Sequence, residues 1–522
     1  MSLGLMLEAA AGRYGEKIAL VSGERRLSYA DLDKASNRVA NALLKIGLNK
    51  GDRIAMLLSN SPEFVITYFG IIKAGAIAVP LDTNCKVAEY TSLIGDFLPK
   101  ALIGESLTLE PLAPVLSRFK SLAHVIDVDA QSDGQFLSYG EIMVASPARR
   151  VEIEPEPDDI ALITYTSGPS FPPRGAVLTH QSLMTEAVVS ADGFGQTDRD
   201  VMMLFALPLY HEFGLVAAML ASVCKGSTLV MVPGTGLSLG SFLTAIEREK
   251  GTMYLGIPYI YALLVDMAEK EGIRNDLSSI RLWCSAGAPL PLDVAKRFRR
   301  HYDYVLLDVW GLSETVCHVT CAPVNGTRKP GSVGQALPGW EVGVVDDNGR
   351  YLPPNRTGEL VIRGPMMTEY YGNPEATAEI LRGGWLYSGD IGRVDEDGYV
   401  FITGRKKDML IIKGQNVYPG DVESVLSAHP KVAEVAALGI PDRLRGEVVG
   451  AVVSLKKGKV ATEQELRRFC LERIASFKVP KQVMFLDSLP RTATGKIDKE
   501  SIRDRLSIPP IFPEEAISTV EG

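Results

Sequence analysis

Cysteine is scarce in this chain of 522 residues, and the six cysteines present form no CxxC pair. So sparse a set argues against a disulfide framework and favours free thiols in a reducing cytosol. Cys317, His318 and Cys321 are close enough in sequence to raise the question of a metal site, but no second group of ligand residues accompanies them. We therefore interpret the cysteines as buried or half-buried thiols and expect a cytoplasmic protein.

Three further absences exclude other classes of protein. No basic arm or stripe is present and the net charge is −8, which argues against nucleic acid as the main partner. The N-terminus has no basic region and Glu8 interrupts its apolar run, so no secretory signal is expected. The most apolar long window, residues 202–223, contains Pro208, His211 and Glu212, a combination that a transmembrane helix rarely carries. We interpret this window as core plus a site loop.

The length of the chain exceeds what one hydrophobic core usually serves, so at least two domains are expected. Ser28 is typical of a helix N-cap, and apolar residues follow it at helical spacing until Gly47. A strand is predicted over 53–58, a helix beginning at Ser61-Pro62, and a short strand over 76–79. This alternation recurs to about residue 310 and indicates βαβ units with a parallel sheet.

The composition and the hydrophobic pattern of the sequence change after Lys329. Glycines and prolines separate short β-like runs up to Val400, which predicts a small β-rich subdomain. A compact α+β segment follows residues 404–408, and Thr462 with Glu465 predicts a capped helix that runs to Ile474. A domain boundary near Lys407 is therefore expected.

Five separated segments carry the chemistry: Tyr165–Gly175, Trp310–Glu314, Tyr387–Asp390, Gly404–Asp408 and Pro490–Lys496. Each alone is also typical of an ordinary turn or helix cap. Together and in this order they resemble the adenylate-forming superfamily, and within it the acyl-CoA synthetases. The resemblance runs from about Tyr29 to Leu506.

The resemblance and the pattern of predicted strands and helices together predict an α/β fold. A large N-terminal domain, residues 1–406, would hold two βαβ-type sheet subdomains and a small β-barrel-like subdomain at about 325–400. A small mobile α+β domain, residues 407–522, would follow. The resemblance makes Lys407 the hinge about which that domain rotates between its adenylating and thioester-forming arrangements. Gly414 would line the entry of the pantetheine thiol of CoA.

The first segment follows a predicted strand, 161–165, and is interpreted as a phosphate loop. It departs from the family pattern, because Pro169 removes an N–H donor, Phe171 stands where glycine would leave a hinge free, and Arg174 replaces lysine. The residues that still offer donors or positive charge toward phosphate are Thr166, Ser167, Gly168, Ser170 and Arg174.

The resemblance assigns the remaining nucleotide contacts. Glu314 would bind the magnesium ion on ATP, which suits a hard cation, and Ser313 would hydrogen-bond the α-phosphate. Trp310 would stack on adenine, and Asp308 would accept from its amino group. Gly287 and Ala288 match the adenine loop, while Asp390 and Arg405 would bind the ribose hydroxyls.

Lys496 and His211 are the residues expected beside the acid. In the resembling family the lysine enters the site for adenylation and stabilises charge on the α-phosphate. The segment 207–214 resembles the wall of the acyl pocket, and this makes His211 a gate or orienting residue. Tyr259, Cys284, Val316 and Cys317 are candidate additional lining residues. An apolar lining favours a fatty or aromatic acid.

The function that follows is an ATP-dependent carboxylic acid–CoA ligase that proceeds through an acyl-adenylate, with ATP, magnesium and CoA as its small-molecule partners. Two alternatives stay open. In the first, the enzyme delivers the acyl group to another acceptor, such as a carrier-protein thiol, or to oxygen in a luciferase-like oxidation. Alternatively, the altered phosphate loop marks a weakened acyl or nucleotide binder. A homodimer is also left open.

Overall fold

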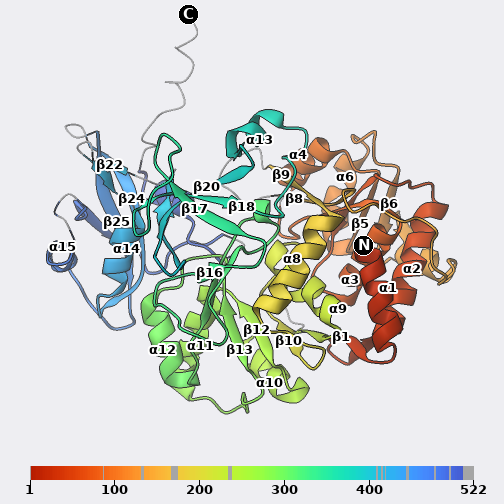
Figure 1. The fold of residues 1–522 in the computed structure, drawn as a ribbon, viewed down its shortest axis with the longest axis horizontal. Coiled ribbons are helices and arrows are strands. Elements are labelled where there is room, and N and C mark those ends of the chain that lie inside the picture. Colours follow the sequence, from red (N-terminus) through yellow and green to blue (C-terminus); the bar gives the residue numbers. More distant parts are fainter. Residues whose placement is uncertain are drawn as a thin grey trace, which may run out of the picture.

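The computed structural model describes residues 2–85, 87–130, 135–165, 174–232, 238–406, 410–412, 415–417, 419–442, 446–474, 476, 478–492 and 495–508. Three sheets with their flanking helices account for the chain up to residue 405, and two smaller sheets follow. Figure 1 shows the C-terminal strands beside β17–β20 and at the opposite side of the molecule from α1 (Leu3–Tyr14).

The larger of the two main sheets has nine strands in the order β16-β15-β14-β13-β12-β10-β11-β1-β2. Its central pairs are parallel, and antiparallel pairs close both edges. The strands are β1 (Ile18–Ser22), β2 (Arg25–Ser28), β10 (Val201–Leu204), β11 (Thr228–Met231), β12 (Met253–Gly256), β13 (Leu282–Ser285), β14 (Leu307–Trp310), β15 (Thr320–Cys321) and β16 (Gln335–Ala336).

The second main sheet has seven strands in the order β7-β6-β5-β3-β4-β8-β9. All its neighbours are parallel except β8 and β9, which flank the predicted phosphate loop. The strands are β3 (Arg53–Leu57), β4 (Ile77–Pro80), β5 (Ala101–Gly104), β6 (His124–Asp127), β7 (Leu137–Ser138), β8 (Ile160–Tyr165) and β9 (Gly175–Thr179). The α/β prediction with two sheets is confirmed.

Local capping explains where the helices begin. Ser28 caps α2 (Tyr29–Lys45), where its Oγ and the Asp31 carboxylate bond each other's backbone N–H, and Ser61 caps α3 (Pro62–Lys73). The other helices of this region are α4 (Val87–Phe97), α5 (Ser106–Leu109), η1 (Glu110–Leu112), α6 (Ala113–Leu116), α7 (Tyr139–Val144), α8 (His180–Gly193), α9 (Ala221–Lys225), α10 (Leu239–Glu249), α11 (Pro258–Glu271), α12 (Leu292–Tyr302), η3 (Ser313–Thr315) and α13 (Pro374–Ile380).

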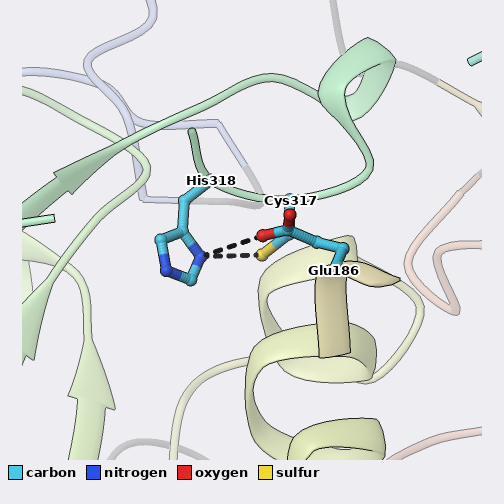
Figure 2. Close-up of side chains that lie close together, drawn as sticks. All are labelled: Glu186, Cys317 and His318. Carbon is cyan, nitrogen blue, oxygen red and sulfur yellow. Dashed lines mark hydrogen bonds and ion pairs between the residues drawn. The ribbon is translucent and has the colours of Figure 1, made fainter. Parts of the chain in front are cut away.

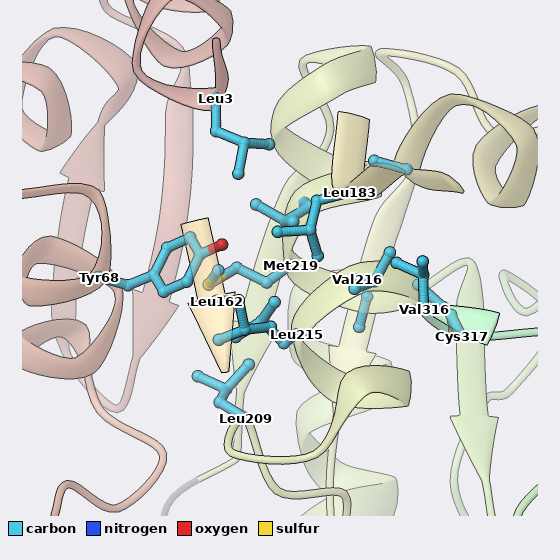
Figure 3. Close-up of a cluster of buried hydrophobic side chains, with 14 of the residues drawn as sticks. Leu3, Tyr68, Leu162, Leu183, Leu209, Leu215, Val216, Met219, Val316 and Cys317 are labelled. Atoms are coloured by element: carbon cyan, nitrogen blue, oxygen red, sulfur yellow. The ribbon is translucent and has the colours of Figure 1, made fainter. Parts of the chain in front are cut away.

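The apolar window of residues 202–223 forms part of the core. It contains β10, a loop, and an eight-residue π-helix, η2 (Phe213–Leu220), in which every residue is buried. Figure 3 shows η2 side chains between Tyr68 of α3, Leu162 of β8 and Leu183 of α8. Among the described residues no helix is long and apolar enough to cross a membrane.

The third sheet joins the main pair through the same hydrophobic core. Its strands are β17 (Glu341–Val345), β18 (Gly358–Arg363), β19 (Leu381–Arg382), β20 (Trp385–Val394) and β21 (Val400–Arg405). They run in the order β17-β18-β20-β19, and β21 pairs with β20. The antiparallel register of β20 and β21 places Asp390 directly opposite Arg405.

The C-terminal part has hydrophobic clusters made only of residues from Leu410 onward. Its helices and strands are β22 (Leu410–Ile412), β23 (Gln415–Val417), α14 (Pro419–Ser427), β24 (Val432–Asp442), β25 (Gly446–Leu455), α15 (Glu463–Leu471), β26 (Gln482–Phe485) and α16 (Lys499–Arg505). Thr462 caps α15 by accepting from the Glu465 N–H at 3.2 Å, as predicted. The helix ends at Leu471 rather than Ile474. The Arg473 N–H donates to the Cys470 carbonyl, only three residues back, at 2.9 Å, which tightens the chain after Leu471.

Candidate active site

The predicted ribose pair forms a hydrogen-bonded group with the predicted adenine residue. The Asp390 carboxylate accepts from Trp310 Nε1 at 2.8 Å and pairs with Arg405 Nε at 2.8 Å. Asp390 is buried at 4% exposure, whereas the Arg405 side chain is 43% exposed. Three separate segments of the chain therefore meet at one carboxylate.

Burial raises the pKa of Asp390 above its ordinary value, and the positive charges of Arg405 and Lys496, together with the Trp310 N–H, act in the opposite direction. The influence of Lys496 means that the C-terminal loop reaches the neighbourhood of this carboxylate. Lys496 has further interactions of its own. Lys496 is thus within electrostatic range of the Asp390 carboxylate.

The adenine loop begins at the end of β13. Ser285 is buried, lies opposite Asp308 of β14, and has a hydroxyl with no partner among the described residues. Gly287 has a φ of +81°, a conformation that side chains disfavour, and it is exposed next to the half-buried Ala288. Desolvation raises the pKa of Asp308 well above its ordinary value.

Glu314 and Ser313 lie on η3, directly after β14, and both side chains are half-buried. The Tyr370 hydroxyl donates to Glu314 Oε1, and the Met367 N–H donates to the Glu314 carbonyl at 2.8 Å. A glutamate carboxylate is the kind of oxygen ligand that magnesium takes together with substrate phosphates, so Glu314 fits that ion as a ligand.

The predicted phosphate loop is bounded by Tyr165 and Gly175, which pair directly across β8 and β9. Thr166, Ser167, Gly168 and Ser170 lie outside the described residues, as do Pro169, Phe171, Lys407 and Gly414. Arg174 is described. Its guanidinium pairs with Glu379 at 3.2 Å and lies 5.4 Å from the centre of the Tyr370 ring.

Tyr370 is a site residue that the motifs did not indicate. It is buried at 4% exposure and contacts both Arg174, which directly precedes β9, and Glu314. Burial raises the pKa of its hydroxyl, and the Glu314 charge raises it further, so Tyr370 stays a donor. The only sequence signal was a tyrosine in the turn before Asn373-Pro374, which is a common turn composition.

His211 lies at the predicted acid wall, in the loop before η2. Its Nδ1 accepts from the Phe213 N–H at 3.3 Å and is 3.5 Å from the Glu212 carboxylate. The contact with the Phe213 N–H favours the neutral tautomer that carries its proton on Nε2, and the contact with Glu212 favours the other. Glu212 is buried and accepts from the Thr164 hydroxyl.

The candidate lining residues separate into two groups. Cys284, Val316 and Cys317 are buried, at 0%, 0% and 7% exposure. Tyr259 is half-buried and contacts a residue of the C-terminal loop, as Arg491 lies 4.4 Å from the centre of its ring. This contact between distant parts of the chain carries no sequence signature.

The cysteine–histidine cluster differs from the one that the sequence suggested. All six cysteines have free thiols, as expected. Cys317 and His318 meet Glu186 of α8, rather than forming a group with Cys321, and their ligand atoms lie within 4.8 Å of one another (Figure 2). His318 Nδ1 is 3.4 Å from Cys317 Sγ and 3.8 Å from Glu186 Oε1.

The Glu186 carboxyl is enclosed by hydrogen-bond donors. It accepts from Trp340 Nε1 at 2.9 Å and from Ser190 Oγ at 3.1 Å. Burial raises the pKa of Glu186 to about 8 against those hydrogen bonds, and burial lowers the pKa of His318 to about 3. We therefore describe the cluster as a buried network that holds one proton on the glutamate at neutral pH.

This network predicts a pH-dependent stability. In the unfolded chain Glu186 loses its proton above about pH 4.5, whereas in the folded protein it does so only near pH 8. The stabilisation that this bound proton gives the folded state is therefore lost as the pH rises through 8. In the unfolded chain His318 gains a proton below about pH 6.5, which it does not hold in the folded protein until about pH 3. Between pH 4.5 and 6.5 the two residues together therefore bind the same number of protons in the folded and unfolded states. We expect the free energy of unfolding to fall by about 2 kcal/mol between about pH 6.5 and 8.

Glu186→Gln should remove this loss, because glutamine keeps the size and an acceptor oxygen but does not titrate. Denaturant titrations at both pH values measure the difference. Glu24→Gln is the matched control, since the Glu24 side chain is 99% exposed. A Glu186→Gln protein with the same pH slope as the wild type would contradict the assignment.

Comparison with known proteins assigns the family. The model of the AMP-binding enzyme family matches residues 7–371, and the model of the AMP-binding enzyme C-terminal domain matches residues 421–496. The chain therefore belongs to the AMP-binding enzyme family, and the predicted resemblance to adenylate-forming enzymes is confirmed.

Relatives that cover almost the whole chain define the enzyme class. A feruloyl-CoA synthase of Amycolatopsis sp is 35% identical over 93% of this chain and 95% of its own. A long-chain-fatty-acid–CoA ligase of Bacillus subtilis is 32% identical over 95% of this chain and 93% of its own. The crystal structure of the anthranilate CoA ligase AuaEII with anthranoyl-AMP has a TM-score of 0.90 at 29% identity, covering 97% of both chains. The predicted class, an AMP-forming acid–CoA ligase, is confirmed.

Proposed function

We propose that this chain activates a fatty or aromatic carboxylic acid with ATP and transfers the acyl group to CoA by means of the residues described above. The observation that carries the proposal is the meeting of Trp310, Asp390 and Arg405 at one buried carboxylate, with Lys496 close enough to influence its pKa. No single one of the segments would distinguish a ligase from an ordinary turn.

The nucleotide is held by three sets of contacts in this proposal. Asp390 and Arg405 bind the ribose hydroxyls, and the indole of Trp310 lies against adenine. The exposed backbone at Gly287 and the neighbouring Ala288 let the base approach closely, and Asp308 faces its amino group. Arg174 and the loop residues Thr166, Ser167, Gly168 and Ser170 receive the β- and γ-phosphates.

Magnesium would be held by the Glu314 carboxylate together with phosphate oxygens. Tyr370 orients that carboxylate by donating to its Oε1. When bound, the ion neutralises charge on the phosphates. Ser313, adjacent on η3, is placed to donate to the α-phosphate.

The first half-reaction joins acid and nucleotide. The substrate carboxylate attacks the α-phosphorus, the bond to the β-phosphate oxygen breaks, and pyrophosphate leaves with the electron pair. Lys496 stabilises the charge that develops on the α-phosphate oxygens. His211 donates from Nε2 and orients the acid, because its Nδ1 is held by the Phe213 N–H.

In the second half-reaction the CoA sulfur attacks the acyl carbon, AMP leaves, and the thiol proton is released. Gly414 is the residue proposed at the thiol entry. We also propose the division into residues 1–406 and 407–522, with Lys407 as the hinge. The separate hydrophobic clusters from Leu410 onward support that division. A homodimer and a cytoplasmic location stay predictions.

The experiment that tests the function is ATP–pyrophosphate exchange across a panel of fatty and aromatic acids. We expect exchange that depends on the acid and, once CoA is added, AMP release in step with thioester formation. Replacing CoA by a purified acyl-carrier protein separates the acceptors. Absence of exchange with every acid, under conditions in which ATP still binds, would contradict the ligase and favour the binder.

A further inference from the structure

The loop that carries Lys496 is a tight hairpin docked on the large domain. The Asp498 N–H donates to the Pro490 carbonyl at 2.9 Å, and the Thr492 N–H donates to the Lys496 carbonyl at 2.8 Å. Gly495 has a φ of +80°, and a Cβ built there would lie only 2.6 Å from Ile257 Cδ1. The hairpin therefore packs against the residues just before α11.

Arg491 connects this hairpin to both sides of the domain interface. Its Nη1 donates to the Gly495 carbonyl at 2.6 Å and its Nη2 pairs with Glu434 of β24. Its guanidinium carbon lies 4.4 Å from the centre of the Tyr259 ring, on the first turn of α11. One side chain thus contacts the lysine hairpin, the sheet of the small domain and the large domain.

We propose that the Arg491–Tyr259 contact is a latch that holds Lys496 in the nucleotide site for adenylation and must open before the thioester step. Tyr259 is then a positioning residue for the lysine and not a wall of the acid pocket. This inference rests on the proposed function for its catalytic consequence. Its structural part, the docking of the hairpin, does not depend on any substrate.

The contact is suited to this purpose because it is specific and reversible. A guanidinium over a tyrosine face at this distance is a favourable cation–π arrangement, strengthened when both groups are partly desolvated. The Arg491 side chain is 26% exposed and Tyr259 is half-buried. An ion pair between the two domains, Lys456 with Asp293 at 3.8 Å, joins side chains that are more exposed than Arg491 and contributes little.

The first test separates the two half-reactions in Tyr259 variants. Tyr259→Leu removes the ring face, and we expect acyl-adenylate formation to slow by about three- to thirtyfold, while thioester formation from supplied acyl-adenylate and CoA is unchanged or faster. Tyr259→Phe keeps the ring face and should behave like the wild type. Equal slowing of both half-reactions, or equal effects of Leu and Phe, would overturn the latch.

A double-mutant cycle distinguishes a latch from a pocket wall. Arg491→Met removes the cation and keeps the length of the side chain. If the two residues act through each other, adding Tyr259→Leu to Arg491→Met should slow adenylation no further. Independent, multiplicative effects, or a rise in KM for the acid confined to Tyr259→Leu, would make Tyr259 a pocket residue and overturn the proposal.

A distance measurement tests the latch without catalysis. Spin labels attached through p-acetylphenylalanine at Arg300 of α12 and Val460, both exposed, report the separation of the two domains. With ATP present, we expect one dominant distance in the wild type and in Tyr259→Phe, and a second, longer population in Tyr259→Leu. Identical distributions in all three proteins would overturn the latch even if no acid supports exchange. A changed distribution with no exchange for any acid would contradict only the ligase.

Discussion

Replacing Lys496 by alanine is expected to lower the rate of acyl-adenylate formation by about 10²–10³-fold, the usual cost of removing one group that stabilises charge in a transition state. The hairpin places this lysine near Asp390, whose pKa responds to its charge. In the proposed mechanism the lysine acts on the α-phosphate, so the later attack of CoA on the adenylate should not need it. The measurement is ATP–pyrophosphate exchange beside thioester formation from supplied acyl-adenylate.

The matched control is Lys499→Ala, three residues further along. Lys499 pairs with Glu423 at 2.8 Å within the small domain, so its loss should leave both half-reactions unchanged. If Lys496→Ala slowed both half-reactions equally, the lysine would have a structural function instead of the proposed one.

Asp390→Asn is expected to weaken ATP binding by about 10- to 100-fold, since a hydrogen bond to a charged group contributes about 1.5–3 kcal/mol. The carboxylate is held in place by Trp310 and Arg405 at 2.8 Å each, which would pre-organise it for the proposed contacts with the ribose hydroxyls. The amide keeps the shape but removes the charge that orients Arg405. Calorimetric titration with ATP in the absence of acid measures the change.

The same sheet offers a control for this prediction. Glu341 and Arg363 are also directly opposite on antiparallel strands and pair at 2.7 Å, but both side chains are at least half exposed. Glu341→Gln should leave ATP affinity unchanged, because exposed ion pairs contribute little. Equal weakening by the two variants would show that the effect comes from the sheet and not from the ribose site.

Much of the architecture could be predicted because its signals are local. Caps such as Ser28 and Thr462 depend on residues three positions apart, and the alternation of apolar runs with turns predicts strands and helices in order. The membership of Asp390 and Arg405 in one site could be inferred from their segments. Their direct pairing is a matter of strand register, which the sequence alone does not determine.

The contacts that could not be predicted from the sequence all join residues far apart in the chain, and no sequence motif links the two partners. Glu186 is one polar residue on a helix, and nothing nearby in sequence links it to Cys317 or to Trp340. Tyr370 reaches Glu314 because residues 367–371 bond both β9 and η3, an arrangement that exists only after the sheets have packed. Tyr259, a predicted lining residue of the acid pocket, also has its ring against Arg491, more than 200 residues away in sequence.

The division of the apolar interior has a mechanical consequence. The third sheet has no interior of its own, since Trp340, Leu360 and Val400 belong to the cluster that begins at Leu3. The segments after Leu410 are closed on themselves by two clusters of their own. A unit that has its own hydrophobic core can rotate from one docking position to another without exposing its apolar residues to water. In the proposed rotation of this unit, each reorientation would exchange only surface contacts, which the binding of a single nucleotide or thioester can outweigh.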